Sequence, residues 1–194
     1  PPSTVQGSPA PRYAAAAGPA HRFPFSARDA LPRLGDASET TGFDRHYVFH
    51  TAWAARAVRA LSPSEHYDIA SSLYFASLVS AFVPVRFFDY RPAELALSNL
   101  SSEHADLLAL PFASGSIQTL SCMHVVEHIG LGRYGEPIDP DGDLRAIAEL
   151  KRVVAPGGSL LFVVPVGGRP RLMFNAHRIY SIPMVLDEFA DAFT

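Results

Sequence analysis

Short apolar runs alternate with segments of helical spacing from residue 67 onward. The apolar runs predict five strands, over 67–70, 85–89, 105–108, 118–122 and 159–165. The intervening segments predict helices over 71–82, 92–99 and 143–154. Apolar strands separated by amphipathic helices are typical of a parallel sheet that is covered on both faces. We therefore expect an α/β fold, a Rossmann-like three-layer sandwich with a mainly parallel sheet.

The pattern is different before this region. Residues 1–40 are rich in Pro, Ala, Ser and Gly and carry few large apolar side chains. That composition predicts an extended or disordered arm, followed by one α/β domain over residues 41–194. Two further helices are expected, over 47–61 and 182–193, because apolar residues recur there at helical spacing.

Composition narrows the class of function. A net charge of -3 provides no basic stripe, which argues against nucleic acid as the main partner. The single cysteine, Cys122, excludes an internal disulfide and suits a reducing compartment, so a cytoplasmic protein is expected. No apolar stretch reaches the roughly 18 residues that span a bilayer. The apolar C-terminal helix covers either its own sheet or that of a partner, so the sequence is compatible with both a monomer and a homo-oligomer.

Acidic residues accompany three successive predicted strands. Asp68 lies in the first, Asp89 ends the second and Asp106 lies in the third. Right-handed crossovers bring the carboxyl ends of parallel strands to one edge, where ligands bind. There, Asp89 is suited to accept both hydroxyls of a ribose, and Asp106 to contact an adenine amino group. The alternative for each single Asp is a turn or a helix cap.

Two histidines and a glutamate follow the fourth predicted strand, and they are the candidate catalytic residues. His124 or His128 is the best general base because imidazole titrates near neutral pH, and Glu127 could orient it. The His-x-x-Glu-His spacing also matches a zinc peptidase motif, although Gly130 would end a helix at once. A role in lining the pocket without chemistry is a further alternative.

Two more groups of polar residues lie near the same edge. Asp139, Asp141 and Asp143 offer oxygen ligands for a divalent cation, or else form a turn and the N-terminal cap of a helix. The loop after the fifth strand is basic, and guanidinium groups bind phosphate in a bidentate manner. Its candidate substrate-binding residues are Arg169, Asn175, His177 and Arg178.

Residues 67–166 resemble a class I S-adenosylmethionine-dependent methyltransferase. The resemblance is carried by FFDYRP, ADLLALPFASGSIQTLSC, VVEHI and LKRVVAPGGSLLFVVP. More narrowly, the chain is similar to the family called domain of unknown function 268. That similarity is carried by TGFDRHYVFHTAWAARA, CMHVVEHIGLGRYGEPIDPDGDL and FNAHRIYS. Some members of the family belong to surface-polysaccharide pathways, which suggests a sugar, nucleotide-sugar or glycan acceptor.

The resemblance implies a cofactor site for S-adenosylmethionine. Its residues would be Asp68, Ala70, Ser71, Ser72, Asp89, Tyr90, Asp106 and Leu107. Methyltransferases of this class carry the pattern acid-x-Gly-x-Gly-x-Gly, whereas this chain has alanine, serine and tyrosine at the three glycine positions. The class also commonly ends with an antiparallel hairpin. Only about 27 residues follow the fifth strand here, so the domain is cut short, the sheet is smaller, or a partner covers its edge.

Three functions remain open from the sequence. The first is methyl transfer from S-adenosylmethionine to a sugar-type acceptor. The second is a metal-assisted reaction on a nucleotide sugar, centred on His124, Glu127 and His128. The third is a non-catalytic binding module with the same fold, which supports a glycosyltransferase or another partner.

Overall fold

The computed structural model describes residues 10–18, 22–23, 25–31, 36 and 38–193, in two compact units, Pro1–Asp44 and Arg45–Thr194. In the first unit, α1 (Ala10–Ala17) and the short 3-10 helix η1 (Ala27–Asp29) lie where the sequence predicts an extended arm. Alanine has the highest helix propensity, which accounts for α1, but none of its residues is buried. The first nine residues of the predicted arm lie outside the described residues.

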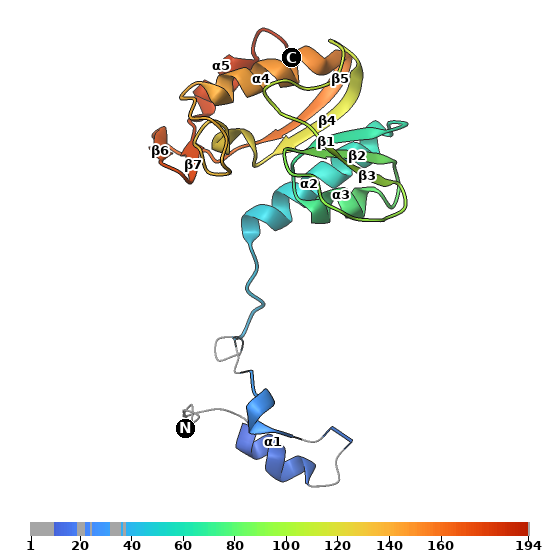
Figure 1. The fold of residues 1–194 in the computed structure, drawn as a ribbon, viewed down its shortest axis with the longest axis vertical. Helices are drawn as coiled ribbons and strands as arrows, with labels where there is room; N and C mark the ends of the chain where they lie inside the picture. The colour runs from blue at the N-terminus through green and yellow to red at the C-terminus, as the bar shows by residue number, and fades with distance from the viewer. Residues whose placement is uncertain (1–9, 19–21, 24, 32–35, 37, 194) are drawn as a thin grey trace. The chain divides into compact units, whose positions relative to one another are not determined.

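The second unit is built on a five-stranded parallel sheet. Its strands are β1 (His66–Ile69), β2 (Val85–Asp89), β3 (Leu100–His104), β4 (Ile117–Met123) and β5 (Val154–Val163). The strand order is β3-β2-β1-β4-β5 (Figure 1). The predicted α/β sandwich is thus confirmed. The direction of strand order reverses between β1 and β4, where ligands bind in folds of this kind.

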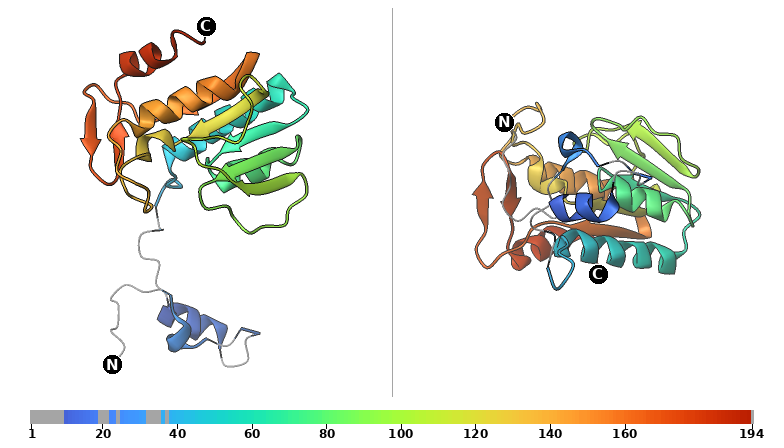
Figure 2. Two further views of the ribbon diagram at one scale, coloured as in Figure 1. Left: turned by 45° about the horizontal axis from the view of Figure 1, so that its top comes forward. Right: turned by 90° about the horizontal axis from the view of Figure 1, so that it is seen from below.

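Helices cover both faces of the sheet. α2 (Arg45–Leu61) and α3 (Leu73–Val79) lie on one face, and α4 (Gly142–Val153) and α5 (Ile182–Phe189) lie on the other (Figures 1 and 2). Consecutive strand residues point to opposite faces, so Phe87 joins the cluster under α2 and α3 while Phe88 joins the cluster under α4. No helix among the described residues is both long enough and apolar enough to cross a bilayer.

Two elements differ from the prediction in the region of β3. The segment 92–99, predicted as a helix, contains no helix, and the strand predicted over 105–108 lies at Leu100–His104 instead. Asn99 has a φ of 58° and turns the chain into β3. The apolar residues Leu107 and Leu110 are buried because the turn after β3 packs them into the core. Residues buried in a turn are apolar, as residues of a buried strand are, and for this reason the segment was predicted to be a strand.

The loop after β5 contains two short strands that the pattern did not predict. β6 (Arg171–Met173) and β7 (His177–Ile179) form an antiparallel pair in a sheet of their own. Asn175 lies between them with a φ of 60°, a conformation that Asn adopts more readily than most residues. The five-stranded sheet itself ends at β5.

A buried polar network joins β1 to β4 beneath the switch point. Ser121 Oγ donates to Asp68 Oδ2 and lies 2.9 Å from Nε2 of His66, and all three residues are fully buried. Burial raises the pKa of Asp68 to about 6 and lowers the pKa of His66 to about 4. The histidine is therefore neutral at pH 7, with Nε2 as donor to the serine.

Candidate functional site

A cavity of about 310 Å³ opens at the carboxyl ends of the strands. Its wall is formed by the residues that follow β1, β2, β3 and β4, and by the loop that precedes α4. This volume falls at the small end of the range for small-molecule sites. The polar residues that line it include Asp89, Asp106, His124, His128, Glu136 and Asp139.

Asp89 and Asp106 line this cavity and also shape the loops that carry them. Asp89 Oδ1 accepts the N–H of Arg91 at 2.8 Å, and Asp106 Oδ1 accepts the N–H of Leu108 at 2.9 Å. The second carboxylate oxygen of each residue has no hydrogen bond within the described part of the chain. Each acid therefore has the predicted turn role and keeps one carboxylate oxygen outside these hydrogen bonds. The neighbouring residues Tyr90 and Leu107 also line the cavity.

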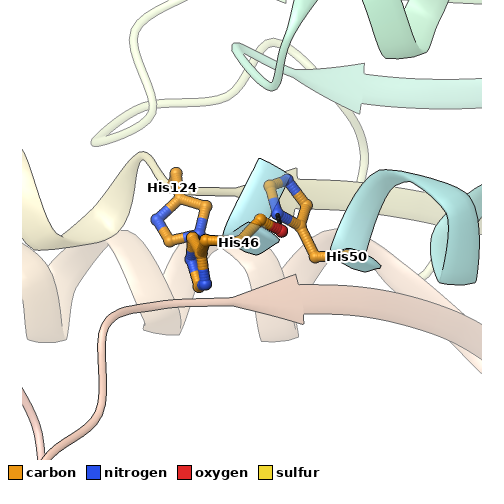
Figure 3. A group of neighbouring side chains, drawn as sticks. All are labelled: His46, His50 and His124. Carbon is orange, nitrogen blue, oxygen red and sulfur yellow. Dashed lines mark hydrogen bonds between the residues drawn. The ribbon is translucent and has the colours of Figure 1, made fainter. Parts of the chain in front are cut away.

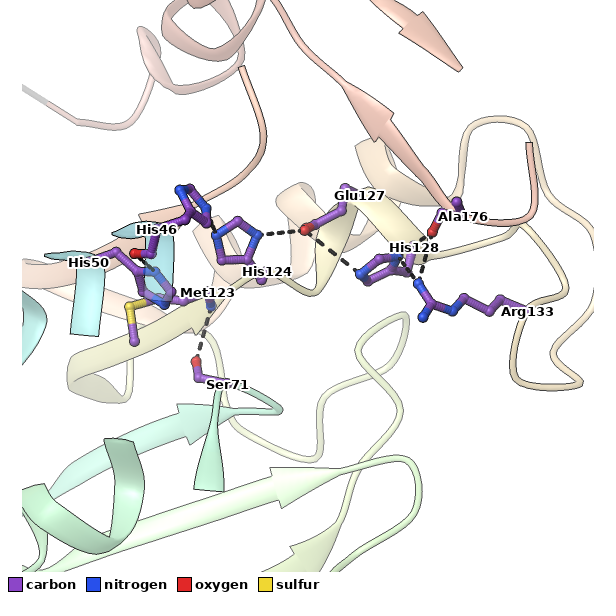
Figure 4. A network of polar contacts seen from close by, with 9 residues as sticks. All are labelled: His46, His50, Ser71, Met123, His124, Glu127, His128, Arg133 and Ala176. Carbon is purple, nitrogen blue, oxygen red and sulfur yellow. Dashed lines mark hydrogen bonds and ion pairs between the residues drawn. The ribbon is translucent and has the colours of Figure 1, made fainter. Parts of the chain in front are cut away.

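Hydrogen bonds to β1 and β4 fix the loop that follows β1. Asp68 is buried beneath the cavity and accepts the N–H of Ser71 at 3.0 Å, while Ser71 Oγ accepts the N–H of Met123 (Figure 4). Ser72 is the N-cap residue of α3. Of the four predicted cofactor residues in this loop, Ala70 alone lines the cavity. Asp68 and Ser71 support the loop, whereas the side chain of Ser72 makes no capping hydrogen bond.

Ala70 has a φ of 51°, in the left-handed region that favours glycine. We expect Ala70→Gly to stabilise the protein by about 0.5–1 kcal/mol. Relief of the left-handed strain, about 1–2 kcal/mol, exceeds the added entropy of the unfolded chain. Urea unfolding measures this. Ala57→Gly, in the interior of α2, is the matched control and should lose about 1 kcal/mol. If Ala70→Gly destabilises the protein as Ala57→Gly does, the backbone at residue 70 is not strained.

The three candidate catalytic residues form one row of polar contacts, in which His124 is hydrogen-bonded to Glu127 and His128 lies close to the same carboxylate (Figure 4). His124 follows β4 with a φ of 61°, and its Nδ1 lies 2.8 Å from Oε1 of Glu127. That oxygen lies 3.7 Å from Nε2 of His128. Both histidines line the cavity, whereas Glu127 is 1% exposed and lies behind them. Glu127 Oε2 is buried and has no hydrogen-bond partner among the described residues.

His128 closes the short 3-10 helix η2 (Val126–His128), and so does not share a helical face with His124. Its Nδ1 lies 2.6 Å from the carbonyl oxygen of Ala176, which also accepts from Arg133. This contact places the proton on Nδ1 and the lone pair on Nε2. Burial lowers the pKa of His128, so the ring is neutral at pH 7 and can accept a proton.

The fold brings two further histidines to this row from α2. His46 and His50 lie beside His124, with ring centroids 4.3 Å and 4.9 Å from that of His124 (Figure 3). Nε2 of His46 contacts Nε2 of His124. The interpretation of the sequence missed both residues. Their signal was a His-x-x-x-His spacing, which places two imidazoles on one helical face, but the helix predicted over 47–61 begins one residue after His46.

The four predicted substrate-binding residues of the C-terminal loop do not line the cavity. The guanidinium group of Arg178 donates to the carbonyl oxygens of Ile129 and Pro140 at 2.7 and 2.9 Å. Arg178 therefore ties β7 to the loop before α4. His177 lies beside His128, with ring centroids 6.3 Å apart. The cationic residues that line the cavity are instead Arg91 and Arg145.

Arg169 and Asn175 lie in or next to the β6–β7 hairpin, and the contacts of each are local. The carbonyl oxygen of Arg169 accepts from the Arg171 side chain, and Asn175 occupies the hairpin turn. Neither contact reaches the row of histidines. A direct role for these two residues in substrate binding stays a prediction.

The three aspartates before and within α4 stabilise that region. Asp139 Oδ1 accepts the N–H of Asp141, and its Oδ2 pairs with Arg145. Asp143 accepts from the Tyr180 hydroxyl at 2.9 Å, and burial raises the pKa of that hydroxyl far above its ordinary value. These contacts support the predicted turn, whereas Asp141, the N-cap residue of α4, makes no capping hydrogen bond with its side chain.

The fold is that of class I methyltransferases, as similar solved structures show. YcgJ from Bacillus subtilis has a TM-score of 0.55 and 14% identity, over 75% of this chain and 68% of that chain. A putative methyltransferase from Bacillus halodurans has a TM-score of 0.52 and 16% identity, over 71% and 67%. A geranyl diphosphate C-methyltransferase from Streptomyces coelicolor, solved with S-adenosylhomocysteine, has a TM-score of 0.50 and 12% identity, over 72% and 56%.

The C-terminal part of the chain also matches a family model. Residues 101–191 match the family described as "Caenorhabditis protein of unknown function, DUF268". This match confirms the family resemblance predicted from the sequence, and it covers the row of His124, Glu127 and His128. A search of the curated proteins found no match to this sequence.

Proposed function

We propose that the chain is a methyltransferase that binds S-adenosylmethionine in the cavity at the carboxyl ends of β1, β2 and β3. The observation that carries the proposal is the pair of cavity-lining acids, Asp89 and Asp106, each with one carboxylate oxygen outside the loop hydrogen bonds. Asp89 would accept the ribose hydroxyls, and Asp106 would accept from the adenine amino group. Leu107 and Ile69 supply apolar wall for the ring.

The alanine at position 70 is compatible with this site. Glycine is used where a backbone must take a positive φ or approach a ligand closely. Ala70 already has the required left-handed conformation, and its methyl group is the smallest side chain that can replace glycine. The loop is fixed by its hydrogen bonds to Asp68 and through Ser71 to β4. We infer that this geometry takes the place of the missing glycines.

When bound, S-adenosylmethionine supplies an electrophilic methyl group. The residues that remain on the cavity wall act on the acceptor. His128 lines the cavity and its ring is neutral with the lone pair on Nε2, so it can take the proton from an acceptor hydroxyl. Glu127 then stabilises the imidazolium that forms, because its buried carboxylate is 3.7 Å away.

The acceptor that we propose is a sugar, nucleotide sugar or glycan. This proposal rests on the family resemblance and on the polar part of the cavity wall. Arg91, Glu136 and Arg145 line that part together with Tyr134, over which Arg91 lies at 4.8 Å. Charged side chains of this kind can hydrogen-bond the hydroxyl groups of such a ligand.

A binding comparison tests the cofactor site. We expect Asp89→Ala to weaken binding of S-adenosylmethionine by at least about tenfold, because hydrogen bonds to a charged group contribute about 1.5–3 kcal/mol. Equilibrium dialysis with labelled S-adenosylmethionine measures this. The matched control is Glu94→Ala, which removes a nearby acid that does not line the cavity. Equal affinities in the two variants would exclude Asp89 from the site.

A further inference from the structure

One cluster of metal-ligating side chains lies beside the proposed cofactor cavity. His46 and His50 come from consecutive turns of α2, and His124 comes from the end of β4 (Figure 3). One ring nitrogen of each lies within 4.8 Å of the others. Within the described part of the chain, it is the group of three or more His, Cys, Asp or Glu side chains that meets this spacing.

We propose that His46, His50 and His124 bind one divalent transition-metal ion of the zinc class. Three imidazoles suit zinc, cobalt, nickel or copper, whereas magnesium and calcium prefer oxygen ligands. Three histidines with one further position left for water or a ligand oxygen is an established arrangement for zinc. The proposal goes beyond methyl transfer and does not depend on it.

The contact between His124 and Glu127 is the second observation that points to a metal. A histidine that binds a metal through one nitrogen almost always donates its other N–H to a carboxylate, a carbonyl or water. His124 does so through Nδ1, 2.8 Å from Glu127, which leaves Nε2 directed toward His46 (Figure 4). Glu127 is 1% exposed, and a cation on His124 would compensate the buried negative charge.

The ring of His50 is oriented in a similar way. Its Nδ1 lies 2.8 Å from the main-chain carbonyl oxygen of His46, one turn earlier in α2. This contact places the proton on Nδ1 and the lone pair on Nε2. A backbone carbonyl is the other common partner of a histidine that ligates a metal. Two of the three rings therefore have their tautomers set by the surrounding protein.

The spacing is close to what an ion requires. Zinc–nitrogen bonds of about 2.1 Å in a tetrahedron place the ligand nitrogens about 3.4 Å apart. The observed nitrogens lie within 4.8 Å of one another, so their largest separation exceeds this value by at most about 1.4 Å. His46 lies in the exposed first turn of α2, so its ring has room to rotate. Because His124 also lines the cofactor cavity, the ion would lie at the wall of that cavity.

Metal titration of the full chain, free of any affinity tag and stripped with a chelator, tests the proposal. We expect one equivalent of Zn²⁺ or Co²⁺ to bind and to raise the thermal unfolding midpoint, because the ion links α2 to β4. Bound Co²⁺ should show the intense visible absorption of a four-coordinate site. His46→Ala and His50→Ala should each abolish the absorption and the shift in midpoint.

Two further variants separate a built site from adventitious binding. Glu127→Gln keeps the shape of the side chain but removes its charge, and should weaken metal binding about 10–100-fold. His104→Ala removes a histidine of β3 that lies outside the cluster, and should leave metal binding unchanged. If wild type binds no ion, or if His46→Ala binds as tightly as wild type, the three histidines form only a hydrogen-bonded cluster. S-adenosylmethionine binding is measured on the metal-free protein, so the two proposals fail separately.

Discussion

Replacement of His128 by alanine should lower the rate of methyl transfer by about 10²–10⁴-fold, the usual contribution of a general base. The imidazole is neutral because burial lowers its pKa, and Nε2 is the nitrogen that can take the proton. Binding of S-adenosylmethionine should be unchanged, because His128 is assigned to the acceptor. The measurement is transfer of a labelled methyl group to a panel of sugars and nucleotide sugars, with S-adenosylhomocysteine release as a second readout.

A structural role for His128 would give a different result. Its Nδ1 contact with Ala176 helps to hold the β6–β7 hairpin, so an alanine variant that unfolds or loses cofactor affinity would indicate support of the loop. Arg59→Ala, at an exposed position of α2 that does not line the cavity, is the control and should keep the wild-type rate. Transfer at the wild-type rate by folded His128→Ala would show that another group takes the proton.

The second large effect is the pH dependence of the free energy of unfolding that the buried His66 causes. Burial lowers the pKa of His66 from 6.5 to about 4, so the unfolded chain binds a proton in this range that the folded protein does not. The contribution of His66 to stability is complete above pH 6.5 and is lost as the pH falls toward 4. A difference of this size corresponds to about 3 kcal/mol.

Asp68 acts in the opposite direction through the same network. Burial raises its pKa from 3.8 to about 6, so its contribution is complete below pH 3.8 and is lost as the pH rises through 6. We therefore expect opposite effects of His66→Gln and Asp68→Asn. Relative to wild type, the first variant should lose less stability on acidification from pH 6.5 to 4, and the second should lose more. Urea unfolding across this range measures both, and parallel curves for all three proteins would contradict these pKa values.

The sequence was sufficient to predict the three layers of the fold and most of its strands. Apolar strands that alternate with helices usually form a parallel sheet with helices on both faces. The prediction failed near β3, where Leu107 and Leu110 are buried in a turn and so imitate a strand. It also failed for β6 and β7, since strands of three residues are too short to show an alternation. Both failures come from burial or pairing that depends on tertiary contacts rather than on local pattern.

The candidate site was predictable only where a residue lies next to a strand end. Asp89, Asp106, His124 and His128 line the cavity for that reason. The roles of more distant residues depend on how separate segments meet. Nothing local indicated that His46 lies against His124, 78 positions away, or that Arg178 is tied to carbonyl oxygens rather than directed at a ligand.

The central claim is that this cavity binds S-adenosylmethionine, and calorimetric titration of the metal-free full chain with S-adenosylhomocysteine tests it most directly. We predict saturable binding at one site per chain with micromolar affinity. Absence of binding heat, together with an unchanged thermal unfolding midpoint in excess ligand, would contradict the claim. That result would mean that the loop around Ala70 has closed the site while the methyltransferase fold has been kept.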